Sequence, residues 1–222
     1  MTSTPLDLRA DPVAEHFRGC RHEGRGPLCN LPNAVTAVRT VLSLTSSAAG
    51  ILGGSLGWLA LALAVYWIGD IADGAIARRL RQETTAGAVF DIVCDRVCGA
   101  CFFLGMAALD PATAPVVVLF LAEFMVLDLL LSLAFFLFPV NSPNYFGRVD
   151  RRVFRLNWSK VAKSLNSGLV AVLLFTPVST WVPAAIAVAL IGVKSYSLVR
   201  TRSLPRRPDV DCVDTYVRAV SP

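Results

Sequence analysis

The sequence predicts an all-α polytopic membrane protein with six transmembrane helices. Of its 222 residues, 55% are hydrophobic and only 17% are charged, and its mean hydropathy is +0.58. A soluble domain is roughly 45–50% apolar and about 25% charged. The excess apolar residues lie in runs close to the ~20 residues that a helix needs to cross a bilayer. These observations argue against a soluble two-domain protein.

Six apolar runs define the expected helices, and prolines lie at their borders, where a missing backbone N–H is least costly. The expected spans cover approximately residues 33–52, 56–78, 86–109, 115–138, 161–175 and 182–200. Residues 1–30 contain several acidic side chains and no apolar core, so they do not resemble a signal peptide. The expected domains are an N-terminal tail (1–30), a six-helix domain (31–200) and a C-terminal tail (201–222).

Basic residues are distributed unequally among the connecting segments. Residues 53–55, 110–114 and 176–181 contain no Lys or Arg, whereas the tails, residues 78–81 and residues 148–163 contain nearly all of the 21 basic residues. Cytoplasmic segments of membrane proteins are enriched in Lys and Arg. We therefore expect both tails on the cytoplasmic side of the cell membrane. The net charge of +5 then fits contact with anionic lipid, and no nucleic-acid-binding motif accompanies it.

Four aspartates flank the predicted turn between the second and third spans. Asp70 and Asp73 are three residues apart, and Asp91 and Asp95 are four apart, so each pair shares one helix face. The two helices form an antiparallel hairpin through the polar turn at residues 79–85. Both pairs then lie at a similar depth near the cytoplasmic surface, where they can face each other.

The cost of burying these carboxylates indicates a metal site. A carboxylate at mid-bilayer costs ~2.5–3.5 kcal/mol on insertion scales, and four neighbouring carboxylates also repel one another. Mg²⁺ or Mn²⁺ would relieve this repulsion, because both ions prefer oxygen ligands and complete their shells with substrate phosphates and water. Two facing pairs could hold two such ions, an arrangement that suits attack at phosphorus.

The residues around the aspartates suit a phosphate ligand. Gly74 and Gly87 each cost ~1 kcal/mol relative to alanine inside a helix. Their lack of a side chain is useful where a ligand approaches the backbone closely. Ala77 is also small, and Arg78 supplies a forked donor for phosphate oxygens. Close helix packing would explain each glycine singly, but it leaves the paired aspartates unexplained.

The pattern D-x2-D-G-x2-A-R-x8-G-x3-D-x3-D in this chain resembles the signature of the CDP-alcohol phosphotransferases, membrane enzymes of phospholipid synthesis. All eight fixed positions match: Asp70, Asp73, Gly74, Ala77, Arg78, Gly87, Asp91 and Asp95. Pro32-Asn33 with Thr36 and Arg39 also resembles the opening of the family's first helix. The signature covers only a short stretch, but its place across the second and third of six spans is typical of the family.

The resemblance implies a reaction and a role for each signature residue. A phosphatidyl group would pass from CDP-diacylglycerol to an alcohol acceptor, and CMP would leave. Asp70, Asp73 and Asp91 would bind two Mg²⁺ or Mn²⁺ ions, with Asp95 as a further ligand and the general base. The residues expected to bind the cytidine diphosphate are Asp73, Gly74, Ala77, Arg78 and Gly87. The resemblance also implies a homodimer in the bilayer.

Acceptor choice in this family depends on residues outside the signature. Residues 157–164 resemble a Gly-Lys-x-Lys-Thr element of members that use glycerol phosphate or phosphatidylglycerol, with Ser159 in place of the glycine. Lys160, Lys163 and Arg148 are therefore the candidates for acceptor binding, and glycerol 3-phosphate is the favoured acceptor. Phosphatidylglycerol, which would give cardiolipin, and inositol phosphate remain alternatives.

The fourth span departs from the phosphatidylglycerophosphate synthases, which often carry an Arg-Glu pair there. This chain has Ala122-Glu123, followed by Asp128. Acidic residues within a span are candidates for function by default, because their burial is costly. Glu123 and Asp128 are therefore expected to matter, although the sequence names no partner for either.

Two other classes of protein remain open. Intramembrane carboxylates also conduct ions in transporters and channels, so the aspartates could pass a cation. A catalytically inactive family member that serves as an assembly partner is the other alternative. The complete signature argues against both, since neither role requires the Gly-x-x-Ala-Arg context and all four acids.

Overall fold

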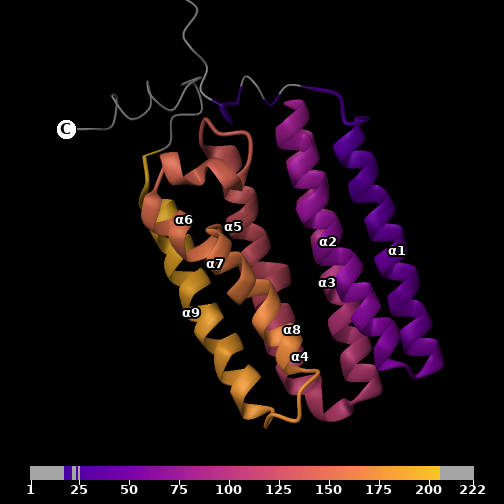
Figure 1. Ribbon diagram of the computed structural model, residues 1–222. Helices are drawn as coiled ribbons and strands as arrows, with labels where there is room; N and C mark the ends of the chain where they lie inside the picture. Colours follow the sequence, from indigo (N-terminus) through magenta and orange to yellow (C-terminus); the bar gives the residue numbers. More distant parts are fainter. Residues whose placement is uncertain (1–17, 22–23, 25, 206–222) are drawn as a thin grey trace, which may run out of the picture.

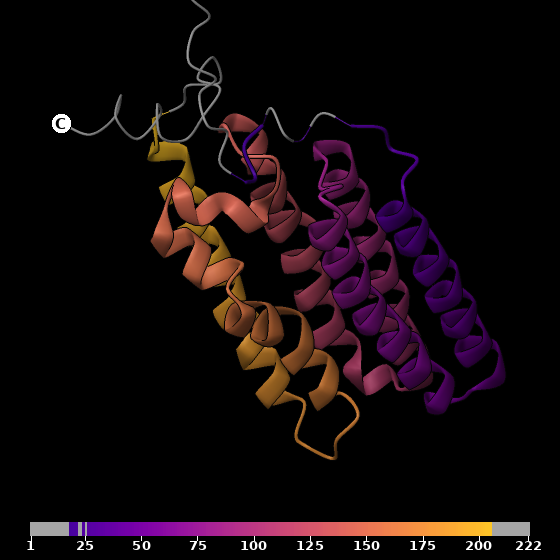
Figure 2. The ribbon, with the colours of Figure 1, turned by 45° about the horizontal axis from the view of Figure 1, so that its top comes forward.

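Three long helices at the N-terminal end of the domain form the part of the fold that carries the signature. The computed structural model describes residues 18–21, 24 and 26–205. In this part of the chain, α1 spans Leu31–Gly53, α2 spans Leu56–Leu80 and α3 spans Thr85–Leu109. Figures 1 and 2 show the three helices side by side, and α1 packs against both of the others.

The ends of these helices follow from local sequence. The Asn30 side chain accepts a hydrogen bond from the backbone N–H of Asn33 at the start of α1, as an N-cap residue does. Thr84 caps α3 in the same way through the N–H of Gly87. Gly54 ends α1 in the left-handed region with φ 62°, which glycine adopts without steric cost. The connection that follows is therefore short, and α1 and α2 run antiparallel.

The fourth span is one continuous helical stretch from Pro111 to Leu137 whose hydrogen bonding changes along its length. It consists of η1 (Pro111–Thr113), α4 (Ala114–Ala122), the π-helical turn η2 (Glu123–Asp128), α5 (Leu129–Leu133) and η3 (Ala134–Leu137). A π-helical turn is uncommon and occurs frequently at functional sites. Here it contains both acidic residues that the sequence singled out.

The helices of the C-terminal half, apart from the last, are shorter and more often interrupted than those of the N-terminal half. It contains η4 (Pro143–Arg148), α6 (Arg151–Asn157), α7 (Lys160–Lys163), η5 (Ser164–Leu169), α8 (Val170–Leu173) and the long α9 (Trp181–Ser203). In both views α9 lies beside α6, α7 and α8, on the far side of the molecule from α1.

The all-α prediction is confirmed, and five of the six expected spans correspond to helices long and apolar enough to cross a membrane. The exception is residues 161–175. Helical structure there runs from Lys160 to Leu173 in three short pieces, about 21 Å at 1.5 Å per residue, and a bilayer core is ~30 Å thick. Polar residues such as Ser164 and Asn166 also interrupt its apolar run. The span at residues 161–175, the total of six spans and the orientation of the tails stay predictions.

Two apolar clusters hold the halves together. In the larger one, aromatic rings of α3 and of the fourth span stack, with the Phe103 and Phe120 ring centroids 4.2 Å apart. The smaller one contains Phe135, Phe146 and Trp158. On the outer surface, Ile68 and Ile71 of α2 are about two-thirds exposed, as lipid-facing residues would be. The same helix therefore turns Asp70 and Asp73 inward.

Candidate functional site

The hairpin of α2 and α3 brings the two pairs of aspartates face to face, because spacings of three and four residues keep each pair on one side of its helix. Carboxylate oxygens of Asp70, Asp91 and Asp95 lie within 4.8 Å of one another. Such a set of oxygen donors fits a hard divalent cation. These three residues could therefore bind the expected metal.

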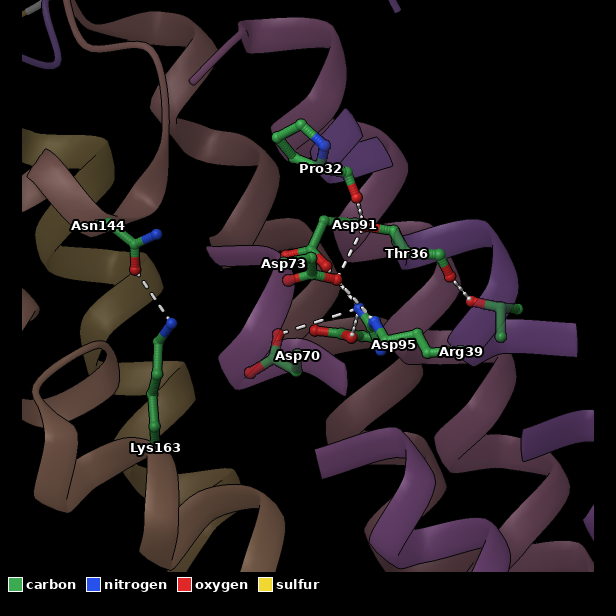
Figure 3. A network of polar contacts seen from close by, with 10 residues as sticks. Pro32, Thr36, Arg39, Asp70, Asp73, Asp91, Asp95, Asn144 and Lys163 are labelled. Carbon is green, nitrogen blue, oxygen red and sulfur yellow. Dashed lines mark hydrogen bonds and ion pairs between the residues drawn. The ribbon is translucent and has the colours of Figure 1, made fainter. Parts of the chain in front are cut away.

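An arginine from α1 points into this group (Figure 3). The Arg39 Nη2 atom lies 2.5 Å from Asp91 Oδ1 and 2.9 Å from Asp95 Oδ1, and its Nε lies 2.8 Å from Asp73 Oδ2. Asp70 is farther away, at 3.9 Å. Only 3% of the Arg39 side chain is exposed. One guanidinium thus contacts all four carboxylates, yet it offsets only one of their charges.

Asp73 is held differently from the other three aspartates. Its Oδ2 accepts hydrogen bonds from the Thr36 hydroxyl, at 2.8 Å, and from Arg39. Asp73 is 4% exposed, whereas Asp70, Asp91 and Asp95 are only partly buried. The resemblance named Thr36 and Arg39 as part of the family's opening, and the structure gives both a place at the aspartates.

A glycine that the sequence analysis did not single out makes this arrangement possible. A Cβ atom added to Gly69 would lie 2.4 Å from Arg39 Cδ and 2.6 Å from Arg39 Cβ. The Arg39 side chain therefore packs against α2 at Gly69, where α2 has no side chain. The signal in the sequence is the dipeptide Gly69-Asp70, in which the glycine directly precedes the first signature aspartate.

One cavity lies on the signature side of the aspartates, and we call it the Gly74 cavity. Its walls include Asp73, Gly74, Ala77, Arg78 and Gly87, the five residues expected to bind the nucleotide, together with Asn33, Thr36, Asp91, Asn141 and Ser142. The two glycines differ in their surroundings. A Cβ on Gly87 would lie 2.8 Å from both Asn33 Oδ1 and Thr84 Oγ1, whereas a Cβ on Gly74 would approach only the mobile end of Arg78. Gly87 is therefore required by packing, and Gly74 leaves room in the cavity.

A second cavity lies on the other side of the aspartates, between α3, the fourth span, α7 and α9; we call it the Glu123 cavity. Asp70, Asp91 and Asp95 form one end of it. The other polar residues on its walls are Arg96, Glu123, Asp128, Ser132, Ser142, Asn144, Asn157, Lys163, Asn166 and Lys194. Asp91 borders both cavities, so ligands in the two would meet at the aspartates.

The predicted acceptor residues are placed unequally. Lys163 lines the Glu123 cavity, and its Nζ donates to Asn144 Oδ1 at 3.0 Å, across from the aspartates (Figure 3). Lys160 and Arg148 are exposed and are not among the residues that line this cavity. Of the three candidates, the structure brings Lys163 alone to the wall that ends at the aspartates.

Two cations that the sequence analysis missed lie on the same wall. Arg96 of α3 and Lys194 of α9 both donate to the Asp128 carboxylate, and Arg96 also donates to the Ser132 hydroxyl at 3.2 Å. The Arg96 guanidinium lies 4.0 Å from the centre of the Phe124 ring. Asp128 thus has its partners, which the sequence could not name. A charged residue within an expected span was the available signal for both cations.

Glu123 contrasts with Asp128, although both lie in η2. It is 1% exposed, and neither of its carboxylate oxygens has a hydrogen-bond partner among the described residues. The charges that face it are those of Asp128, Lys194 and Arg96. A buried carboxylate without partners is costly.

The described part of the N-terminal segment lies against the end of the Gly74 cavity that Arg78 and Glu83 form. Arg18 donates to Glu83 at 3.2 Å and to the backbone carbonyl of Arg78 at 2.5 Å. Tyr145 donates to the same Glu83 carboxylate at 2.8 Å. Burial and this hydrogen bond raise the pKa of Tyr145 to about 12, so its hydroxyl stays neutral and keeps donating.

Asp150 fixes α6 against α9. Its Oδ1 accepts from the backbone N–H groups of Arg152 and Val153, and its Oδ2 accepts from Arg200 Nε at 2.8 Å. Burial opposes ionisation of Asp150, but these donors outweigh it and lower its pKa. The carboxylate therefore remains charged at neutral pH and holds α6 in place.

Comparisons with known proteins agree with the signature. The family model described as CDP-alcohol phosphatidyltransferase matches residues 29–195. A phosphatidylinositol phosphate synthase of Mycobacteroides abscessus is 35% identical over 75 residues, 34% of this chain and 34% of that protein. Its counterpart from Mycolicibacterium smegmatis is 33% identical over 73 residues, 30% of this chain and 33% of that protein. The matched stretch thus spans about a third of each relative's length. No solved structure matches the chain.

The Arg39 contacts predict that the stability of an Arg39 variant depends on whether metal is bound. Replacing Arg39 by alanine should lower the unfolding temperature of the metal-free protein, because it leaves the buried carboxylates without their cation. Removing one partner of a buried ion pair costs ~3–5 kcal/mol. Added Mg²⁺ or Mn²⁺ should reduce the difference from wild type, because the ions replace the missing charge. The measurement is thermal unfolding of the purified protein in detergent, with chelator or with metal.

Arg79→Ala is the matched control, since Arg79 is exposed in the last turn of α2. It should unfold like wild type under both conditions. If Arg39→Ala unfolds at the wild-type temperature in chelator, Arg39 does not offset the repulsion of the aspartates.

Proposed function

Because the chain belongs to the CDP-alcohol phosphatidyltransferase family, we propose that it transfers a phosphatidyl group from CDP-diacylglycerol to an inositol phosphate and releases CMP. The observation that carries this proposal is the position of the aspartates at the junction of two cavities. The Gly74 cavity, with the signature glycines and Arg78, suits the cytidine diphosphate. The Glu123 cavity, with its lysines and Arg96, suits a phosphorylated acceptor.

The favoured acceptor of the sequence analysis, glycerol 3-phosphate, is not supported by the comparisons. Both relatives are named for the synthesis of phosphatidylinositol phosphate, and a product of that name joins a phosphatidyl group to an inositol phosphate. The partial Gly-Lys-x-Lys-Thr match around Lys160 pointed to glycerol phosphate, but Lys160 lies outside the Glu123 cavity. Inositol phosphate, an alternative at the outset, is therefore the acceptor that we propose.

Members of this family use divalent metal ions. In this chain Asp70, Asp91 and Asp95 would bind them, with Asp73 contributing from the side of the nucleotide. Two Mg²⁺ or Mn²⁺ ions, when bound, would neutralise charge on the pyrophosphate and on the departing CMP. Before metal binds, Arg39 supplies part of this positive charge and holds the carboxylates close together.

Asp95 is the proposed general base. It borders the Glu123 cavity and does not border the Gly74 cavity, so it faces the acceptor rather than the nucleotide. In the reaction, an acceptor hydroxyl oxygen bonds to the phosphorus that carries the diacylglycerol, and the bond between that phosphorus and the CMP oxygen breaks. The hydroxyl proton passes to Asp95. CMP retains the electron pair of the broken bond.

The acceptor phosphate would bind the cations of the Glu123 cavity. Arg96, Lys194 and Asp128 together carry one net positive charge, which an ionised Glu123 offsets. Lys163 adds a further cation from α7. We also propose that the protein lies in the cell membrane as a homodimer, with both cavities open to the cytoplasm. The arginine-rich ends of α2 and α9 support that orientation.

Incubation of the purified protein with CDP-diacylglycerol, metal and single acceptors tests the reaction. The panel is inositol phosphate, glycerol 3-phosphate, phosphatidylglycerol, inositol and serine, with lipid products identified by mass and CMP release measured. We expect a product with inositol phosphate, and we expect chelation of the metal to abolish it. A product from glycerol 3-phosphate alone would contradict the acceptor. Cation flux in liposomes without any CMP release would contradict the whole reaction.

The role of Asp95 has its own test. Asp95→Asn should lose at least ~10²-fold in turnover, the lower end of what a positioned base contributes. The amide can still accept the hydrogen bond from Arg39, so the unfolding temperature of the metal-free protein should change little. A variant that retains most of its turnover would remove Asp95 from the role of base.

The proposed orientation can be measured by cysteine labelling in right-side-out membrane vesicles. Gly53 lies at the end of α1 with open space around it, and Arg79 is exposed at the opposite end of α2. Gly53→Cys should react with a membrane-impermeant maleimide in intact vesicles, whereas Arg79→Cys should react only after permeabilisation. The reverse pattern would place the aspartates on the outer side.

A further inference from the structure

Unpaired buried polar atoms are concentrated on the wall of the Glu123 cavity. Among the described residues, nine buried side-chain nitrogen and oxygen atoms have no hydrogen-bond partner, and six of them belong to residues that line this cavity. The acceptors are both Glu123 carboxylate oxygens and Asn157 Oδ1, and the donors are Trp67 Nε1, Arg96 Nε and Asn166 Nδ2. Most buried polar groups in proteins are paired, so a cluster of exceptions indicates a ligand that pairs them.

The cationic neighbours of Glu123 do not pair with it. Arg96 and Lys194 face it, but the hydrogen bonds that they make go to Asp128 and, from Arg96, to Ser132, and neither cation donates to Glu123. Asn157 is similarly fixed, because its Nδ2 already donates to the Val153 carbonyl and to Ser197 Oγ, each at 2.8 Å. These two bonds require the amide nitrogen at that position, so it is the oxygen of Asn157 that remains unpaired.

The π-helical turn explains why Glu123 faces the cavity at all. In an α-helix, residues five apart point in directions that differ by more than a right angle. In the π-helical turn η2, hydrogen bonds join residues five apart, and Glu123 and Asp128 both reach the same cavity wall. The Asp128 carboxylate then binds Arg96 and Lys194, and the Glu123 carboxylate remains for a ligand.

The unpaired atoms define the chemistry of that ligand. An ionised carboxylate only accepts hydrogen bonds, and the ring N–H of Trp67 only donates them. A hydroxyl group does both, so a molecule with several hydroxyls can satisfy both kinds of atom in one cavity. Glycerol 3-phosphate has a single hydroxyl besides the one that reacts, whereas an inositol phosphate presents a ring of further hydroxyls.

We infer that Glu123 is a specificity-determining residue that binds ring hydroxyls of a polyhydroxylated acceptor, and that it selects an inositol phosphate over glycerol 3-phosphate. The inference rests on the proposed function and adds the hydroxyl site to it. Asn157 and Asn166 contribute to the same site, and the cations of the cavity bind the phosphate. Selection of this kind is strong, because an acceptor without the hydroxyls leaves buried polar atoms unpaired.

Two variants of Glu123 separate a binding role from a structural one. Glu123→Gln should lower kcat/KM for inositol phosphate at least ~10-fold more than for glycerol 3-phosphate, because hydrogen bonds to a charged carboxylate are stronger than those to a neutral amide. Glu123→Leu should raise the unfolding temperature of the ligand-free protein, because an apolar side chain replaces an unpaired buried carboxylate. A residue that merely supports the fold would lower that temperature when replaced.

Ligand-induced shifts of the unfolding temperature test binding without turnover. Inositol phosphate should raise the unfolding temperature of wild type more than inorganic phosphate does, and in both Glu123 variants its shift should fall to that of inorganic phosphate. The shift caused by inorganic phosphate should remain, since the cations are intact. Asp110→Asn is the control for loss of an acid, because Asp110 is exposed near η1, and it should behave like wild type in each measurement.

The outcomes distinguish the two proposals. If wild type makes the inositol product and Glu123→Gln keeps the wild-type preference between acceptors, the inference about Glu123 is wrong and the proposed function stands. If wild type binds inositol phosphate through Glu123 but forms no product from it, the proposed reaction is wrong. If inositol phosphate does not shift the unfolding temperature of wild type, the hydroxyl site is overturned.

Discussion

The repulsion among four carboxylates at the end of one helical hairpin is the constraint on which the rest of this structure depends. A single buried arginine, Arg39, contacts all four, and it can do so because α1 crosses α2 at Gly69. The packing of the first three helices is therefore arranged around a charge problem as well as an apolar core. One guanidinium leaves most of the negative charge unbalanced, and that remainder is the physical basis for the divalent cations that we propose here.

Much of this could be predicted from the sequence, because it depends on short-range periodicity. The spacings of Asp70 to Asp73 and of Asp91 to Asp95 fixed which faces of α2 and α3 meet, and the apolar runs located five of the long helices. Residues 161–175 were harder, since a run of moderate hydropathy does not tell a spanning helix from short helical pieces. The acceptor was predicted from the sequence of α7, although the cavity that receives it also takes residues from α2, α3, the fourth span, η4, α6, η5 and α9.

What the sequence could not provide is the pairing of charges between distant helices. Asp128 contacts Arg96 and Lys194 across 32 and 66 residues of chain, and no local pattern specifies such contacts. The π-helical turn at Glu123–Asp128 is equally hidden, because it is a departure from the regular period on which the prediction relies. Both features lie in the wall of one cavity, so the least predictable part of the fold is the part where we place acceptor selection.

The difference between the aspartate site, which the sequence predicts, and the Glu123 cavity, which it does not, has a physical basis. In the reaction that we propose, the aspartates bind cations and, through them, a pyrophosphate that every CDP-alcohol shares, and a short signature on two adjacent helices is sufficient for that task. An acceptor differs in its charge and hydroxyls, and recognising it requires partners on several helices at once. Arg96 and Lys194 are already held by Asp128, whereas the Glu123 carboxylate has no hydrogen-bond partner in the part of the chain that the structure describes. A change at Glu123 would therefore alter the hydroxyl pattern that the cavity accepts while the aspartates and Arg39 keep their contacts.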